Sequence, residues 1–126
     1  EDGRVLYPGT GHAHETGKGK AAGTKLNIPL APGAGDNEFL AAWSRVEAHI
    51  VSHRPEMILF QCGADGLGGD PLAHLRYSPA AHAHAARRLR ALADRLAQGR
   101  LMAFGGGGYD LGNLAMAWNR VLQELI

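Results

Sequence analysis

The sequence predicts an α/β fold in which a parallel sheet packs against helices. Three short segments, two continuously apolar and one alternating, are interspersed with three longer stretches that carry apolar residues at three- and four-residue spacings. The short segments have the length of strands, and the longer stretches have the periodicity of amphipathic helices. Strands and helices that alternate in this way form a parallel sheet through right-handed crossovers. We therefore expect a three-layer α/β/α unit.

The first 24 residues contain several glycines and little periodicity, which predicts a long loop. Residues 25–30 alternate polar and apolar side chains, which predicts a strand, and Pro29 indicates that this strand lies near an edge or an end. Asp36 is the expected N-cap of a helix that ends near His53, before Arg54 and Pro55. The apolar stripe of this helix comprises Phe39, Trp43, Val46 and Ile50.

The second strand is predicted at Met57-Ile58-Leu59-Phe60, because this continuous apolar run is typical of a strand buried on both faces. Ser78 and Pro79 mark the start of the next helix, and Gly99 marks its left-handed end. Its buried stripe comprises Ala81, Ala85, Leu89, Leu92 and Leu96.

The third strand is predicted at residues 101–104, and Asp110 is the expected cap of the last helix. The side chains of this helix that should face inward are Leu114, Trp118, Val121 and Leu125.

The composition excludes several classes of protein. A formal net charge of +1 argues against a nucleic-acid or membrane surface, which usually shows a basic excess. One cysteine excludes an internal disulfide and is typical of a reducing compartment, so we expect a cytoplasmic protein. No apolar run approaches the roughly 20 residues that a membrane span needs. Four arginines of the second helix are expected on its solvated face: Arg87, Arg88, Arg90 and Arg95.

Two segments that follow predicted strands carry candidate functional groups. Asp65 comes soon after the second strand, between small residues, and it could either bind a metal or cap a turn. Asp70 is expected to be a turn residue whose carboxylate binds loop amides. In open α/β sheets, sites form beyond the carboxyl ends of parallel strands, so both segments should meet at one edge.

The glycines at 105–108 allow two interpretations. Consecutive amides before a helix could bind an anion, although a spaced glycine motif and a lysine are missing. Alternatively, the phenol of Tyr109 could donate a hydrogen bond to a developing oxyanion. Of the other candidates, His82 and His84 should point to different faces of their helix, and Cys62 is expected to be a small buried hydrophobe.

The segment Gln61-Cys62-Gly63-Ala64-Asp65-Gly66-Leu67-Gly68-Gly69-Asp70-Pro71-Leu72 closely resembles the zinc-ligand loop of the zinc-dependent histone deacetylase superfamily, which has an arginase-like fold. Gly105 to Asp110 resembles the catalytic tyrosine loop of that family. The segments Tyr7 to Gly11, Gly17 to Lys20 and Asn27 to Leu30 resemble the part between its earlier zinc motif and these loops. Bacterial members of this kind are often labelled acetoin-utilisation proteins.

The resemblance implies roles for particular residues. Asp65 would be one zinc ligand, and Tyr109 would polarise the acetyl carbonyl. Tyr7 and Leu72 would be walls of an acyl-lysine channel, and Gly107 would line its floor. The reaction implied is zinc-assisted hydrolysis of an acetyl amide, with a histidine as general base, acting on acetylated lysine or a small acetylated amine.

The Asp-x-His zinc pair and the tandem catalytic histidines of the family have no counterpart in this sequence. A catalytic zinc needs three protein ligands, and Asp65 supplies one. We therefore expect residues 1–126 to be a single partial domain, the C-terminal part of a deacetylase domain, which is inactive alone. Its exposed apolar surface would associate with the missing N-terminal half or with a second copy. The alternative is a non-catalytic α/β module that binds an anion or a nucleotide through its glycine loops.

Overall fold

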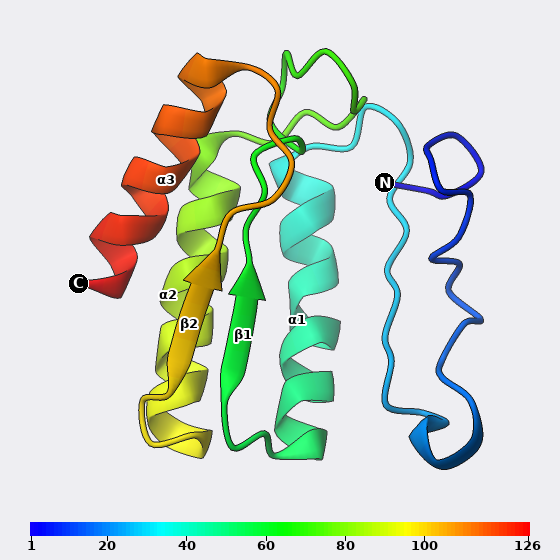
Figure 1. Ribbon diagram of the computed structural model, residues 1–126, viewed down its shortest axis with the longest axis vertical. Coiled ribbons are helices and arrows are strands. Elements are labelled where there is room, and N and C mark those ends of the chain that lie inside the picture. The colour runs from blue at the N-terminus through cyan, green and yellow to red at the C-terminus, as the bar shows by residue number, and fades with distance from the viewer.

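The sheet contains two parallel strands, β1 (Ile58–Gln61) and β2 (Leu101–Phe104), in a computed structural model that describes all 126 residues. Ile58 pairs with Leu101 at one end of the ladder, and Gln61 pairs with Phe104 at the other. The helices are α1 (Asp36–His53), α2 (Pro79–Leu96) and α3 (Leu111–Leu125), with a short 3-10 turn η1 (Gly19–Ala21) near the N-terminus (Figure 1). The predicted order from the first helix onward and the parallel direction of the sheet are confirmed.

The strand expected at residues 25–30 does not form. The segment is extended, but neither β1 nor β2 pairs with it, and it runs on the far side of α1 (Figure 1). The side chains of Leu26, Ile28 and Leu30 are half-buried in a groove beside α1. The alternating pattern therefore indicates that one face of this segment packs against the protein. It does not indicate whether another strand pairs with the segment.

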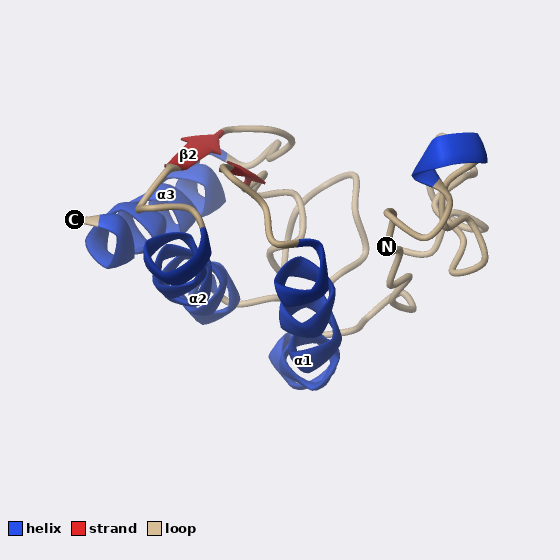
Figure 2. Cartoon of the chain, turned by 90° about the horizontal axis from the view of Figure 1, so that it is seen from below, coloured by secondary structure: helices blue, strands red, loops and turns tan.

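The two faces of the sheet have different environments. Ile58 is buried and Phe60 is half-buried on the face that α2 covers, whereas Leu59 of β1 is 65% exposed. Met102 and Phe104 of β2 are exposed as well. The helices lie on one side of the strands, and no element covers the other side (Figure 2). The prediction that residues 57–60 are buried on both faces is wrong for this chain, because the second layer of the expected three-layer sandwich is not part of it.

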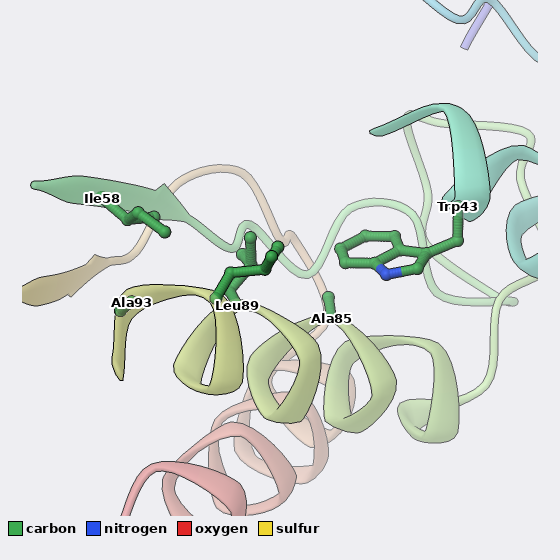
Figure 3. Close-up of a cluster of buried hydrophobic side chains, with 6 residues drawn as sticks. Trp43, Ile58, Ala85, Leu89 and Ala93 are labelled. Atoms are coloured by element: carbon green, nitrogen blue, oxygen red, sulfur yellow. The ribbon is translucent and has the colours of Figure 1, made fainter. Parts of the chain in front are cut away.

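The main core lies where α1 and α2 meet the covered face of β1 (Figure 3). Its largest member is the indole of Trp43, whose Nε1 donates to Oε1 of Glu47 over 2.6 Å. The alanines of α2 let this helix approach the sheet closely, and each fully buried leucine contributes about 1.5 to 3 kcal/mol. The buried side chains of this core are Trp43, Ile58, Ala85, Leu89, Leu92 and Ala93.

Side chains satisfy the ends of the helices largely as predicted. Oγ of Ser78 accepts from the N–H of Ala80 at the start of α2, and Oδ1 of Asp110 accepts from the N–H of Asn113 in α3. The first helix differs, because its N-cap is Gly35 and Asp36 lies inside the helix. The carboxylate of Asp36 instead accepts from the N–H and the hydroxyl of Ser78, and so joins the starts of α1 and α2.

The four arginines of α2 are exposed, as expected, and three of them also make ion pairs or hydrogen bonds. Arg88 forms two bonds of 2.6 Å to the carboxylate of Glu47 in α1, and Arg87 binds Glu124 in α3. These charges therefore connect neighbouring helices. None of the helices is long and apolar enough to span a membrane.

Candidate functional site

The loops that follow β1 and β2 meet at the carboxyl edge of the sheet, where they cross above the arrowheads (Figure 1). The N–H of Ala64 donates to the carbonyl of Gly107 over 2.6 Å, and the N–H of Cys62 donates to Phe104 over 2.9 Å. Both strands run in the same direction, so their following loops must lie at the same edge. The predicted convergence of the two candidate segments is confirmed.

Asp65 lies against the glycine loop. An added Cβ at Gly107 would stand 2.2 Å from Oδ2 of Asp65, so only glycine leaves room for this carboxylate. The side chain of Asp65 is half-buried, and its two oxygens accept no hydrogen bond from the rest of the chain. A turn cap would have such bonds, so the geometry favours a carboxylate that is available to a ligand.

A cavity of about 320 Å³ lies beside Asp65, between the end of β1 and the first turns of α1 and α2. Most of its lining residues are hydrophobic, and the ionisable groups among them include Asp65, His82 and Cys62. The lining includes Phe39, Trp43, Phe60, Tyr77 and Ala81.

His82 is buried and its Nε2 lies 2.8 Å from the carbonyl oxygen of Gly63. The other ring nitrogen, Nδ1, is buried without a partner. This contact ties the first turn of α2 to the loop that carries Asp65. His84, two residues further on, packs instead against Trp43 with ring centroids 5.4 Å apart. The prediction that these two histidines face different directions is confirmed.

Asp70 connects the two loops. Its Oδ1 accepts from the N–H groups of Leu72 and Ala73, over 2.9 and 3.2 Å, as predicted for a turn residue. Its Oδ2 accepts from the N–H of Tyr109 over 2.9 Å. Burial disfavours the charged carboxylate, but these three donors hold the pKa of Asp70 below its ordinary value.

Sequence reasoning missed a second polar connection between the loops. Asn113 is buried in the first turn of α3, and its Nδ2 donates to the carbonyl of Gly68 over 3.2 Å. A polar amide soon after the helix cap is the only local signal, because the partner carbonyl lies 45 residues earlier in the chain.

The other predicted site residues lie on the surface. Tyr109 and Leu72 have exposed fractions of 58% and 55%. Tyr7 is 93% exposed in the N-terminal segment. The structure therefore places Asp65, Gly107 and the backbone of Tyr109 in connected loops, whereas the side chains of Tyr7 and Leu72 do not line the cavity beside Asp65.

No group of three or more histidine, cysteine, aspartate or glutamate side chains in the chain could hold a metal ion. The rings of His49 and His53 lie against each other, tilted by 43° with centroids 4.2 Å apart, without an acidic partner. Cys62 is buried, and Sγ donates to the carbonyl of Phe104 over 3.2 Å. Burial raises the pKa of its thiol, so Cys62 is the small hydrophobe that the sequence predicts.

Comparison with known proteins extends these observations. The family model described as "Histone deacetylase domain" matches residues 1–125. Acetoin utilization protein AcuC of Bacillus subtilis (strain 168) is 37% identical over 99% of this chain, which spans 33% of AcuC. The crystal structure of an HDAC homolog complexed with SAHA has a TM-score of 0.88 and 35% identity, covering 99% of this chain and 33% of that one. The structure of the HDA15 HD domain has a TM-score of 0.89 and 28% identity, covering 98% and 34%.

The fold class implied by the resemblance is thus confirmed, because the chain superimposes on part of the α/β domain of solved deacetylases. The chain spans about a third of the length of the relatives that it matches. The match of the domain model over almost all residues, together with the identity to AcuC, shows that the chain belongs to the histone deacetylase family.

Proposed function

We propose that this chain contributes one zinc ligand and the carbonyl-polarising phenol to a zinc-dependent deacetylase that hydrolyses acetylated lysine or a small acetylated amine. The observation that carries the proposal is the contact between the two glycine loops. It sets the free carboxylate of Asp65 against Gly107, two residues before Tyr109. We assign this activity to the whole protein, because the chain spans only about one third of the length of its relatives.

The residues present fit a metal only in part. A carboxylate at a strand end, without hydrogen bonds of its own and open to a cavity, is a suitable ligand for Zn²⁺. The chain contains no second or third side chain placed to complete the site. The other ligands must therefore come from outside residues 1–126, from the part of the domain that precedes them in our proposal.

A zinc ion bound in this way would supply Lewis acidity at the acetyl carbonyl. Tyr109 has the complementary role in the chain: its hydroxyl donates a hydrogen bond to the carbonyl oxygen as negative charge develops there. Loss of one such donor typically lowers the rate by about 100- to 1000-fold. The exposed phenol is available to a substrate that approaches from the carboxyl edge of the sheet.

In our proposal, the rest of the domain supplies the missing walls of the acyl-lysine channel. Leu72 and Tyr7 are exposed here, and each offers an apolar surface to an acyl-lysine chain only when another wall faces it. Gly107 borders Asp65 and would form the floor of the channel. The exposed face of the sheet around Leu59 and Met102 would be covered by the same missing part.

We expect this chain alone to be inactive, since it lacks ligands and the histidine base. Zinc content and hydrolysis of an acetyl-lysine peptide should be measured for residues 1–126 and for the polypeptide extended upstream. The extended polypeptide should bind zinc and be active, and Tyr109→Phe should lower its kcat by about 100- to 1000-fold. Stoichiometric zinc and turnover by residues 1–126 alone would refute the incomplete-site proposal. An unchanged rate in Tyr109→Phe would refute the role of Tyr109.

The competing prediction, an anion- or nucleotide-binding module, is tested with the same two polypeptides. Two carboxylates, Asp65 and Asp70, lie beside the glycine loop, and one amide of that loop is already bound by Asp70. Both features disfavour an anion. Saturable binding of phosphate or ATP by residues 1–126 would support the competing prediction instead.

A further inference from the structure

We propose that Asp70 is a positioning residue, whose buried carboxylate fixes the backbone of Tyr109 and thereby the place of its phenol. This inference rests on the proposed function, because it assigns Asp70 a role in a reaction that Tyr109 assists. It concerns a residue that would touch neither metal nor substrate.

The two oxygens of the Asp70 carboxylate bind amides of different loops. Oδ1 accepts from two amides of its own loop, those of Leu72 and Ala73, and this would satisfy an ordinary turn. Oδ2 reaches across to the other loop, where it accepts from the N–H of Tyr109, 39 residues further along the chain. Only 8% of Asp70 is exposed, so water competes little for these bonds.

The charge of Asp70 strengthens this link. Three N–H donors keep the pKa of the carboxyl below its ordinary value despite burial, so the group is ionised at neutral pH. Hydrogen bonds to a charged acceptor are about twice as strong as those between neutral groups. Asp70 therefore gives the tyrosine loop an anchor stronger than a backbone carbonyl would.

The tyrosine loop needs such an anchor because of its composition. Four consecutive glycines precede Tyr109, and glycine has the largest backbone freedom of all residues. Gly108 has a φ of +132°, which side-chain-bearing residues rarely adopt. The phenol itself is more than half exposed, so side-chain packing contributes little to its position.

Hydrogen bonds also hold the chain before and after Tyr109. The carbonyl of Gly107 accepts from Ala64 before it, and Asn113 binds the carbonyl of Gly68 after it. Asp70 is the contact at Tyr109 itself. These three links hold the loop of Asp65 against the loop of Tyr109 and the first turn of α3, so the backbone of Tyr109 has a fixed position relative to Asp65.

The test is Asp70→Asn in the active, upstream-extended polypeptide, alone and combined with Tyr109→Phe. The amide oxygen of asparagine can replace Oδ1 or Oδ2, but its NH2 group then faces an N–H on the other side. Because displacement of a reacting group by about 1 Å can cost about 100-fold in rate, we expect kcat to fall by about 10- to 100-fold. KM and zinc content should stay unchanged.

The double variant separates positioning from general stability. If Asp70 acts only through Tyr109, then Asp70→Asn should lower kcat no further once Tyr109→Phe is present. An equal factor in both backgrounds, or a wild-type kcat for Asp70→Asn, would overturn the inference. An unchanged rate for Tyr109→Phe alone would instead overturn the proposed function. If Asp70→Asn does not fold, Asp70→Glu is measured in its place, with the same expected dependence on Tyr109.

The matched control is Asp36→Asn. Asp36 is also a carboxylate that accepts from a loop N–H, that of Ser78, and that connects two distant parts of the chain. It lies in the first turn of α1, and its side chain makes no hydrogen bond to the loop of Tyr109. Asp36→Asn should lower the melting temperature and leave kcat near the wild-type value.

Discussion

The carboxylate of Asp65 lies in the space that a side chain at position 107 would occupy, with 2.2 Å between Oδ2 and the site of an added Cβ. Gly107→Ala should therefore displace Asp65 in the active polypeptide. We expect a fall in kcat/KM of about 100-fold or more, since this is the cost of a misplacement of about 1 Å. Zinc affinity, measured by competition with a chelator, should fall in parallel.

Gly105→Ala is the matched control for this prediction, because an added Cβ there would meet Trp118 at 3.7 Å, an ordinary van der Waals contact. It should retain zinc affinity and activity. Equal losses in the two alanine variants would show that the loop needs flexibility at both positions rather than space beside Asp65.

Leu59 should be buried in the whole protein although it is 65% exposed in this chain. Substitutions on a true surface usually change the free energy of unfolding by no more than about 0.5 kcal/mol. A lysine forced into a buried apolar contact costs several kcal/mol, so Leu59→Lys should lower the free energy of unfolding of the extended polypeptide by about 3 kcal/mol or more. Urea denaturation measures this difference.

Leu40→Lys provides the comparison, since Leu40 is an exposed leucine of α1, 44% accessible, and does not belong to the sheet. Its effect should stay small. A small effect for Leu59→Lys as well would mean that the face of the sheet stays open.

The hydroxyl of Ser78 accepts from the N–H of Ala80 and donates to Asp36. Ser78→Ala should lower the free energy of unfolding by about 1 to 2 kcal/mol, because the helix loses its cap. Ser44→Ala, an exposed change inside α1, should have almost no effect. Chemical denaturation of both variants measures the difference, and equal midpoints would contradict the capping role.

The imidazole of His84 should make stability depend on pH. Burial lowers its pKa from the ordinary value of 6.5, and the nearby Arg87 and Arg88 lower it further, while Glu47 opposes them. As the pH falls through about 6.5, the unfolded chain binds a proton that the folded chain binds less readily. The free energy of unfolding should therefore decrease between pH 7 and pH 5.

His84→Leu should weaken that pH dependence, and Ser44→Ala, an exposed change at a residue that does not titrate, should leave it intact. The measurement is urea denaturation at several pH values. A slope that is unaltered by His84→Leu would assign the pH dependence to another group.

Local patterns in the sequence determined the helices, the two strands and the turn at Asp70. Apolar spacing identified α1, α2 and α3, and capping by Ser78 and Asp110 follows from bonds within three residues. The position of Asp65 just beyond a strand was also evident, since parallel strands end at one edge. These features depend on neighbours in the chain, so the sequence alone contains them.

Only the tertiary structure determined the features in which a residue contacts another residue far away in the sequence. The alternating residues 25–30 lack a strand to pair with, and Leu59 lacks a covering layer, which no local pattern reveals. Likewise, the bond from Tyr109 to Asp70 joins groups 39 residues apart. A hydrogen bond or a packed face exists only when both sides are present in space, and folding determines which distant groups meet.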